Sequence, residues 1–253
     1  MVLNSFDLQG KVALVTGCNT GLGQAMAVGL AQAGCDIIGV NRSEPHETLD
    51  KIHALGRRFL DLRADLTSIE SIPRLLESAV SEFEHIDILV NNAGIIRRED
   101  ALEFSEQDWD DVMNVNSKTL FFMAQAVARQ FIKQGRGGKI INIASMLSFQ
   151  GGIRVPSYTA SKSAVMGITR LLANEWAKHN INVNAIAPGY MVTNNTEQLR
   201  ADEGRSQEIL DRIPAGRWGE QHDIMGPVVF LASGASDYVN GYTLAVDGGW
   251  LAR

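Results

Sequence analysis

The residue pair with the clearest chemical potential is Tyr158 and Lys162, which lie four positions apart in the segment Tyr-Thr-Ala-Ser-Lys. In a helix, side chains at positions i and i+4 share one face and lie one turn apart. A free tyrosine titrates at roughly pH 10. We therefore expect the charge of Lys162 to lower the pKa of Tyr158 and make the phenol a usable proton donor and acceptor. Taken alone, such a pair is more often surface decoration than an active site.

A hydroxyl group that can assist this chemistry is Ser145, thirteen residues before Tyr158 and directly after an apolar run over 139–144. If that run is a strand, Ser145 lies at the carboxyl edge of a sheet, where ligands bind in open α/β folds. Its hydroxyl can bind a substrate carbonyl as negative charge develops on the oxygen. A single serine at a strand end is more often a turn or cap residue.

A glycine-rich turn lies near the start of the sequence, in the segment Thr-Gly-Cys-Asn-Thr-Gly-Leu-Gly over 16–23. Glycine lets the backbone approach a pyrophosphate, which then accepts hydrogen bonds from the free N–H groups at the start of a helix. Glycines alone are a weak signal because strand-to-helix turns favour them. The apolar run before this segment and the helical pattern after it strengthen the signal, so a dinucleotide is the expected ligand.

The elements that must position these residues follow from the hydrophobic pattern. Short apolar runs alternate with longer stretches of helical period. We expect strands over 11–17, 35–40, 57–62, 86–90, 138–144, 181–187 and 243–246, and helices over 22–33, 68–83, 106–133, 158–178 and 221–232. Strands that are apolar on both faces and joined by helices specify an α/β fold with a doubly wound parallel sheet of about seven strands.

We expect one domain over 1–253, because no repeat or linker divides the sequence and one α/β domain of this size is common. The least regular segment is 189–220, which mixes charges around short helical pieces. A segment of this kind near strand ends can act as a mobile lid over a site. The alternative is an ordinary surface excursion.

The glycine spacing, with three residues and then one between successive glycines, resembles that of the short-chain dehydrogenase/reductase family. The order of Ser145, Tyr158 and Lys162 is similar to that family's catalytic pattern, and Asn91-Asn-Ala-Gly resembles its sheet-stabilising motif. Locally, this last motif can also be a plain turn. The resemblance implies a Rossmann-type fold and an NAD(P)-dependent oxidoreductase acting on CH–OH groups.

The resemblance also implies a mechanism. Asn116, rather than the nearby Asn114, is in register with the family's fourth catalytic position. Hydride would pass between a nicotinamide and a substrate carbon while Tyr158 exchanges a proton with the oxygen that Ser145 holds. Lys162 would bind the nicotinamide ribose and support the phenolate, and Asn116 would position Lys162 and a relaying water. No metal is expected.

The expected cofactor contacts combine the glycine turn, the second strand's end and four further segments implied by the resemblance. They are Gly17, Asn19, Thr20, Gly21, Leu22, Gly23, Asn41, Arg42, Asp65, Leu66, Asn92, Ala93, Gly94, Tyr158, Lys162, Pro188, Gly189, Met191 and Thr193.

The choice of cofactor is open at this stage. NAD is the usual cofactor of the similar proteins, but Asn41 replaces the acidic residue expected to bind a ribose diol, and Arg42 can face the 2′-phosphate of NADP. Arg42 can equally be a solvated loop residue.

Several loops resemble those of family members that act on 3-deoxy sugar acids in pectin and uronate breakdown, notably 91–104, 144–158 and 238–250. A hydroxylated carboxylate requires a cation and polar donors. The loop residues that can supply them are Arg97, Arg98, Gln150, Arg154 and Asn194, although each is individually more often a surface residue. The alternatives are family reductases of gluconate or of 3-oxoacyl carrier-protein thioesters and, more remotely, a non-catalytic nucleotide-sensing protein.

Composition narrows the class of protein. The net charge of −6 argues against nucleic acid, which needs clustered Lys and Arg. The two cysteines, Cys18 and Cys35, form no metal or disulfide pattern and fit a reducing cytoplasm. No export signal or membrane span is expected. The resemblance implies a homotetramer, and the apolar stretch 120–123 suits either an interface or the core.

Overall fold

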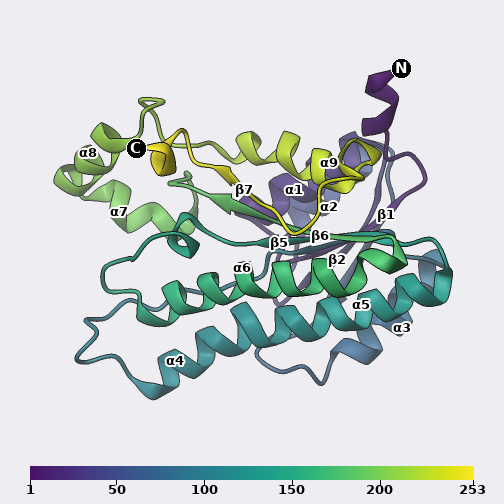
Figure 1. Cartoon of the computed structure of the whole chain (residues 1–253), viewed down its shortest axis with the longest axis horizontal. Helices are drawn as coiled ribbons and strands as arrows, with labels where there is room; N and C mark the ends of the chain where they lie inside the picture. The colour runs from purple at the N-terminus through teal and green to yellow at the C-terminus, as the bar shows by residue number, and fades with distance from the viewer.

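The computed structural model describes all residues, 1–253. Seven parallel strands form one sheet in the order β3-β2-β1-β4-β5-β6-β7 (Figure 1). The strands are β1 (Val12–Thr16), β2 (Asp36–Asn41), β3 (Phe59–Arg63), β4 (Ile88–Asn91), β5 (Gly138–Ile143), β6 (Ile181–Pro188) and β7 (Thr243–Val246). The predicted doubly wound α/β fold is confirmed, and the predicted strand bounds differ from these by at most two residues at either end.

Helices cover both faces of the sheet (Figure 1). On one face lie α1 (Gly21–Gln32), α2 (His46–Ala54) and α9 (Met225–Ala232). On the other lie α3 (Ile72–Phe83), α5 (Leu120–Gln134) and α6 (Pro156–Trp176), with α4 (Glu106–Met113) packed against α6. Because β1 and β4 are buried along their whole length, apolar side chains alternate between two cores, as expected for a parallel sheet covered on both sides.

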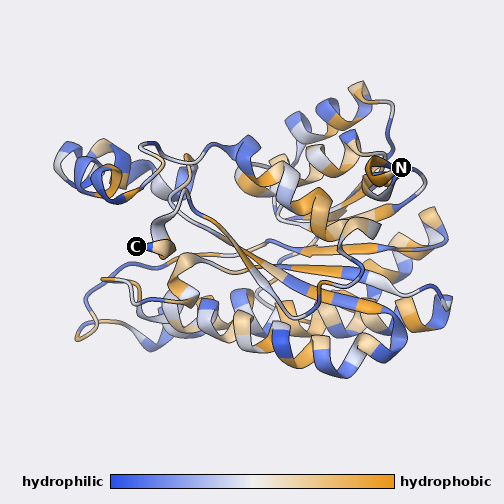
Figure 2. Ribbon diagram, turned by 45° about the horizontal axis from the view of Figure 1, so that its top comes forward, coloured by the Kyte–Doolittle hydropathy of each residue, from blue (hydrophilic) through white to orange (hydrophobic).

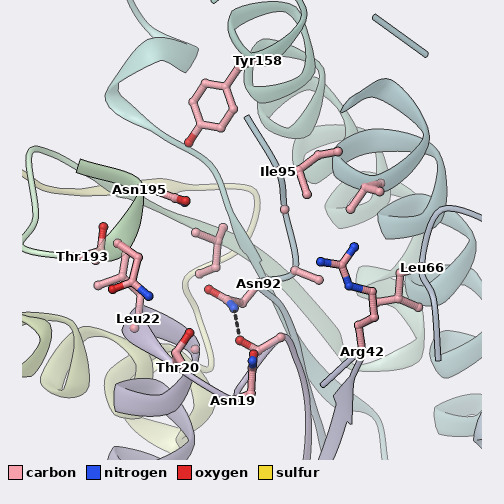
Figure 3. A pocket seen from close by; sticks show the side chains of 18 of the residues that line it. Asn19, Thr20, Leu22, Arg42, Leu66, Asn92, Ile95, Tyr158, Thr193 and Asn195 are labelled. Atoms are coloured by element: carbon pink, nitrogen blue, oxygen red, sulfur yellow. Dashed lines mark hydrogen bonds between the residues drawn. The ribbon is translucent and has the colours of Figure 1, made fainter. Parts of the chain in front are cut away.

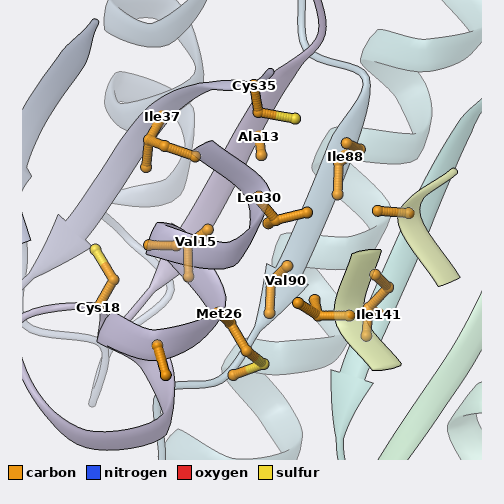
Figure 4. Packing of buried hydrophobic residues seen from close by; sticks show 14 of the residues in the cluster. Ala13, Val15, Cys18, Met26, Leu30, Cys35, Ile37, Ile88, Val90 and Ile141 are labelled. Atoms are coloured by element: carbon orange, nitrogen blue, oxygen red, sulfur yellow. The ribbon is translucent and has the colours of Figure 1, made fainter. Parts of the chain in front are cut away.

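The two cores fix the strands that carry the site. Ala13 and Val15 of β1 face Met26 and Leu30 of α1 in the first core (Figure 4). Leu14 of β1 points the other way and packs with the helices of the opposite layer. Figure 2 shows the result: the strands are largely hydrophobic, whereas the outer helix faces are hydrophilic. No helix combines the length and apolar character needed to cross a membrane.

Two parts of the helical prediction were wrong. The stretch expected as one helix over 106–133 is α4, a π-helix (Asn114–Thr119) and α5 in succession. Hydrophobic period does not distinguish a π-turn from an α-turn, so the π-helix could not be predicted from the apolar pattern. Helix α2 was not predicted, because only Thr48 and Ile52 of its nine residues are buried and its apolar pattern is correspondingly weak.

The segment 189–220 contains two short helices, α7 (Glu197–Ala201) and α8 (Glu203–Arg212). They project beyond the sheet, beside the turn that follows β7 (Figure 1). In α7 no residue is buried, and in α8 only Ile209 is.

Candidate active site

A cleft of about 520 Å³ opens at the carboxyl ends of strands β1 to β6. It contains most of the residues predicted from sequence, drawn in part in Figure 3. The predicted residues that line it are Gly17, Asn19, Thr20, Gly21, Leu22, Gly23, Arg42, Asp65, Leu66, Asn92, Ala93, Gly94, Arg97, Ser145, Tyr158, Lys162, Pro188, Gly189, Met191, Thr193 and Asn194. Five do not line it: Asn41, Arg98, Asn116, Gln150 and Arg154.

The glycine turn forms a cradle that no other residue type fits. Gly17 has a φ of 66°, which L side chains rarely adopt. A Cβ on Gly23 would lie 2.1 Å from the Gly17 carbonyl oxygen. The side chain of Thr20, at the N-cap of α1, makes no capping hydrogen bond. The first-turn N–H groups of α1 therefore remain available to an anion, and this part of the cleft fits a pyrophosphate.

The Asn-Asn-Ala-Gly segment holds that cradle in place. The Asn92 side-chain amide donates to the carbonyl oxygens of Thr16 at 3.0 Å and Gly17 at 2.9 Å. In return, the Thr16 hydroxyl accepts from the backbone N–H groups of Asn92 and Ala93, both at 3.0 Å. These bonds connect the ends of β1 and β4, so the motif does more than form a local turn.

The adenine end of the cleft contains Arg42, Asp65 and Leu66. Hydrogen bonds from Thr67 lower the pKa of Asp65, and the positive charge of Arg42 lowers it further. Arg42 forms no ion pair with an acidic residue, and its guanidinium points toward the cleft (Figure 3). A basic group of this kind fits the 2′-phosphate of a dinucleotide.

Asn41 lies beneath this end instead of facing the cleft. It is only 2% exposed, its side-chain nitrogen contacts the Cys18 sulfur at 3.6 Å, and its oxygen Oδ1 has no partner. Burial raises the pKa of the Cys18 thiol to about 12. Asn41 therefore packs against a neutral thiol in the core, a position that strand periodicity alone did not reveal.

At the opposite end, Tyr158 and Lys162 project from the first turns of α6, and Ser145 follows β5. Figure 3 shows the Tyr158 ring pointing into the cleft. Ser145 caps a short 3₁₀ turn, its oxygen accepting from the Leu147 N–H at 3.2 Å. The Ser145 hydroxyl lies near enough to the Tyr158 phenol to lower its pKa.

Lys162 is almost completely buried, at 4% exposure. Its Nζ donates to the Ile143 carbonyl oxygen at 2.6 Å and lies 5.6 Å from the centre of the Tyr158 ring. Burial lowers the pKa of Lys162 to about 8, because a charged ammonium loses hydration there.

The pKa of Tyr158 is raised rather than lowered, so the sequence expectation was wrong in direction. Burial is the main cause, opposed by the hydrogen bond with Ser145 and the positive charge of Arg98. Lys162 does not lower it, since its ammonium is directed to Ile143. The helical spacing placed the pair on one face, as expected, but did not account for the desolvation of the phenol.

Asn116 is a buried residue of the π-helix, 1% exposed. Its oxygen accepts from the Ile95 N–H at 2.9 Å, and its nitrogen donates to the Ile95 carbonyl at 2.9 Å and the Ser161 hydroxyl at 3.1 Å. The side chain therefore clamps the loop after β4 to α6, one residue before Lys162, and makes no direct bond to Lys162.

The turn after β6 supplies the remaining wall. Pro188, Gly189, Met191 and Thr193 line the cleft, and Thr193 begins a capping box over Asn194–Thr196. Residues that line the cleft but were not predicted include Ser43, Thr67, Ile95, Asn195 and Thr196. Each lies within two positions of a predicted residue, so including the sequence neighbours of each motif would have found them.

The polar residues expected near the substrate separate into distinct environments. Arg97 lies at the cleft but pairs with Asp108 at 3.1 Å and Asp111 at 3.5 Å. Arg154 lies outside and pairs with Glu99 and Asp100, both at 3.3 Å. Gln150 also lies outside.

Arg98 differs from both of these arginines. It forms no ion pair within 4.0 Å, and its Nη2 donates to the Asn195 carbonyl oxygen at 2.9 Å. Its charge reaches Tyr158, so Arg98 is a cation near the chemical end without a neutralising carboxylate.

Comparison with known proteins gives full-length matches. The short chain dehydrogenase family matches residues 11–204. The 2-dehydro-3-deoxy-D-gluconate 5-dehydrogenase of Escherichia coli is 78% identical over 253 residues, covering 100% of both chains. The protein of the same name from Bacillus subtilis is 56% identical, covering 99% of this chain and 98% of its own.

A solved structure from Agrobacterium tumefaciens with bound NADP, assigned provisionally as a 2-deoxy-D-gluconate 3-dehydrogenase, is 59% identical with a TM-score of 0.94. The match covers 99% of this chain and 100% of the other. With the cradle, the Ser145-Tyr158-Lys162 cluster and these matches, the chain belongs to the short-chain dehydrogenase family and is an NAD(P)-dependent oxidoreductase.

Proposed function

We propose that this oxidoreductase interconverts a keto and a hydroxyl group on a 3-deoxy sugar acid, with 2-dehydro-3-deoxy-D-gluconate as the substrate, in the breakdown of pectin-derived uronates. The observation that carries the proposal is the arrangement at the chemical end of the cleft. A proton-exchanging phenol and a serine hydroxyl line this end, and Arg98, which has no acidic partner, is the sequence neighbour of the lining residue Arg97. The names of the Escherichia coli and Bacillus subtilis relatives support the same substrate class.

The chain's own residues supply proton transfer and orientation. A nicotinamide dinucleotide, when bound, supplies or accepts the hydride. Tyr158 gives a proton to the substrate oxygen during reduction and takes it back during oxidation. Ser145 donates a hydrogen bond to the same oxygen, where negative charge develops.

Lys162 binds the cofactor beside the Tyr158 phenol, and Asn116 positions Lys162. The Lys162 ammonium provides donors for the cofactor's ribose hydroxyls beside Tyr158. Asn116 keeps Ile95 and α6 together and so fixes the position of Lys162 through Ser161, its neighbour.

Arg98 is our candidate for binding the substrate carboxylate. Arg97 and Arg154 are already neutralised by two acidic groups each, whereas Arg98 uses one nitrogen on a backbone carbonyl. The guanidinium has further N–H groups, which can bind a carboxylate in the bidentate geometry that arginine favours. Asn194, in the adjoining turn, is the candidate polar contact for a substrate hydroxyl.

NADP is the cofactor that the adenine end favours, with NAD as an alternative. The guanidinium of Arg42 supports NADP because no carboxylate neutralises it. We further propose that 189–220 acts as a lid, since α7 and α8 bury few residues, and that the enzyme is a cytoplasmic homotetramer, as the family resemblance implies.

One assay series tests these assignments. Reduction of a 5-keto-3-deoxy sugar acid is measured with NADH and NADPH side by side, with 5-ketogluconate and a 3-oxoacyl thioester as competing substrates. The expected result is the highest kcat/KM for the 3-deoxy sugar acid. A higher value for either competitor assigns that competitor's reaction instead, and cofactor binding without any turnover indicates a nucleotide sensor.

The Arg98 assignment has a matched control in Arg154. Replacing Arg98 with Met is expected to raise the KM for the sugar acid about tenfold or more, the loss of one charge-assisted contact. Arg154→Met removes a guanidinium that is already paired with Glu99 and Asp100 and should leave that KM within about twofold. Equal KM values for wild type and Arg98→Met contradict the assignment.

A further inference from the structure

Trp250, in the turn after β7, joins three segments around the substrate end of the cleft. Its side chain is 4% exposed and packs in one cluster with Met146, Ile209 and Ile213. Met146 follows Ser145 directly. Ile209 belongs to α8, and Ile213 follows it. The indole therefore lies between the loop that carries the serine and the proposed lid.

Polar contacts connect the same segments a second time. The Trp250 ring N–H donates to the Gln150 side-chain oxygen at 3.2 Å, and Arg212 donates to that oxygen at 3.4 Å. The Arg212 guanidinium also lies over the Trp250 ring, 4.0 Å from its centre. Gln150, which does not line the cleft, thus ties the loop after Ser145 to α8 and to Trp250.

A third connection runs through Tyr190. Its ring meets Trp250 edge-on, with 4.8 Å between the ring centres, and meets Trp218 at 5.4 Å. The two neighbours of Tyr190 in sequence, Gly189 and Met191, line the cleft. Trp250 is therefore in contact with the wall after β6 as well as with α8.

The turn that presents Trp250 is itself held firmly. The Asp247 carboxylate accepts from the N–H groups of Gly249 and Leu251, both at 2.9 Å. Gly248 and Gly249 have φ values of 64° and 92°, and a Cβ on Gly248 would lie 2.9 Å from Ile213. The Asp247 carboxylate and the two glycines thus define the backbone of the turn that presents Trp250.

We propose that Trp250 is a positioning residue that holds α8 and the Tyr190 turn at a fixed distance from the loop carrying Ser145, and so determines the width of the substrate end. The cofactor cradle lies at the other end and does not depend on it. Only the kinetic part of this inference rests on the proposed substrate.

The test uses Trp250→Phe, which removes the bond to Gln150 but keeps a ring, Trp250→Leu, which removes the ring, and Gln150→Leu, which removes the shared acceptor. Trp109→Phe is the matched control, since Trp109 is half-exposed on α4, away from the cluster. We expect the sugar-acid KM to rise about fivefold in Trp250→Phe and Gln150→Leu, the equivalent of one neutral hydrogen bond. In Trp250→Leu it should rise about fiftyfold or more.

Two further readouts separate positioning from general destabilisation. The Kd for ADP, which carries only the adenosine and pyrophosphate part of the cofactor and so probes the glycine cradle, should stay within about twofold of wild type in every variant. Trypsin cleavage after Arg200, Arg205 or Arg212 should be faster in the Trp250 and Gln150 variants than in wild type and Trp109→Phe, because an undocked segment is open to proteolysis.

The proteolysis comparison needs no substrate, so it decides the inference even if the sugar acid is not turned over. Unchanged cleavage and unchanged KM in the Trp250 and Gln150 variants overturn the proposal. A parallel loss of ADP affinity overturns it as well, since the effect would then extend to the glycine cradle. If Trp250→Leu does not fold, the two conservative variants provide the same comparison.

Discussion

The chemistry of single residues in this cleft depends on burial as much as on charge. Tyr158 and Lys162 share a helix face, yet burial raises the pKa of the phenol and lowers that of the ammonium. A raised pKa keeps Tyr158 protonated near neutral pH. In that state the phenol is ready to donate a proton to a keto oxygen.

Tyr158 is the residue whose removal should affect turnover most selectively. Tyr158→Phe retains the ring but has no proton to exchange, so kcat should fall about a hundredfold to ten-thousandfold. Cofactor affinity, measured by fluorescence titration, should change by less than about twofold. Residual activity close to that of wild type contradicts the role of Tyr158. Trp109→Phe, an aromatic substitution outside the active site, is the control.

Lys162 should lower the stability of the protein at neutral pH. Burial lowers its pKa from the usual 10.5 to about 8 in the folded protein, so between these pH values the unfolded chain binds more protons than the folded one. Stability of the wild type therefore rises with pH through this window, and the full penalty of burying the charge is present below about pH 8. Lys162→Met avoids this penalty.

The expected gain for Lys162→Met near pH 7 is on the order of 3 kcal/mol, reduced by about 1 kcal/mol for the lost bond to Ile143. Urea unfolding at about pH 7 and about pH 9.5 measures the difference between variant and wild type. The difference in free energy of unfolding between Lys162→Met and wild type should be smaller at the higher pH. A difference that is independent of pH contradicts a buried, titrating ammonium.

At the scale of elements, the strands were predictable and the helix interruptions were not. β1 and β4 are buried on both faces, which leaves a continuous apolar run in the sequence. The π-helix leaves no such mark, since Val115 and Leu120 keep an apolar pattern through it. Helix α2 and the pair α7 and α8 bury too few side chains to create a clear helical period.

The π-helix matters because it presents Asn116 to the loop after β4. Asn116→Ala should leave the Ile95 N–H and carbonyl without partners, a cost of about 1 to 3 kcal/mol, and lower kcat at least about tenfold by loosening α6 near Lys162. Asn114→Ala, in the same π-helix, makes a matched control because no side-chain bond of Asn114 is present. Thermal unfolding and steady-state kinetics measure both effects, and equal results for the two variants contradict the clamp.

At the scale of the whole molecule, sequence motifs located the cleft but did not assign its charges. The glycine turn lies more than a hundred residues before Ser145 and Tyr158, yet parallel strand ends bring all three to one edge. The sequence does not show which arginine is free to bind a substrate, because the acidic residues that pair with the others are brought to them only by the tertiary fold. Arg97 meets acidic residues of α4, and Arg154 meets the loop that contains Glu99. Asn41 was misplaced for a similar reason, since its partner Cys18 comes from another strand's turn.

The cofactor cleft spans both halves of the sheet, so occupying it should stabilise the whole fold, and the size of this effect should reveal the cofactor. At a hundred times its Kd, a ligand adds about 2.7 kcal/mol, which raises the Tm of a protein of this size by roughly 5 to 10 °C. We expect NADPH to give the larger shift at equal concentration. Arg42→Ala should reduce the NADPH shift, through a Kd about tenfold to a hundredfold higher, and leave the NADH shift unchanged. Arg42 does not contact a 2′-phosphate if NADH and NADPH give equal Tm shifts in wild type. The same conclusion follows if Arg42→Ala weakens NADH binding as much as NADPH binding.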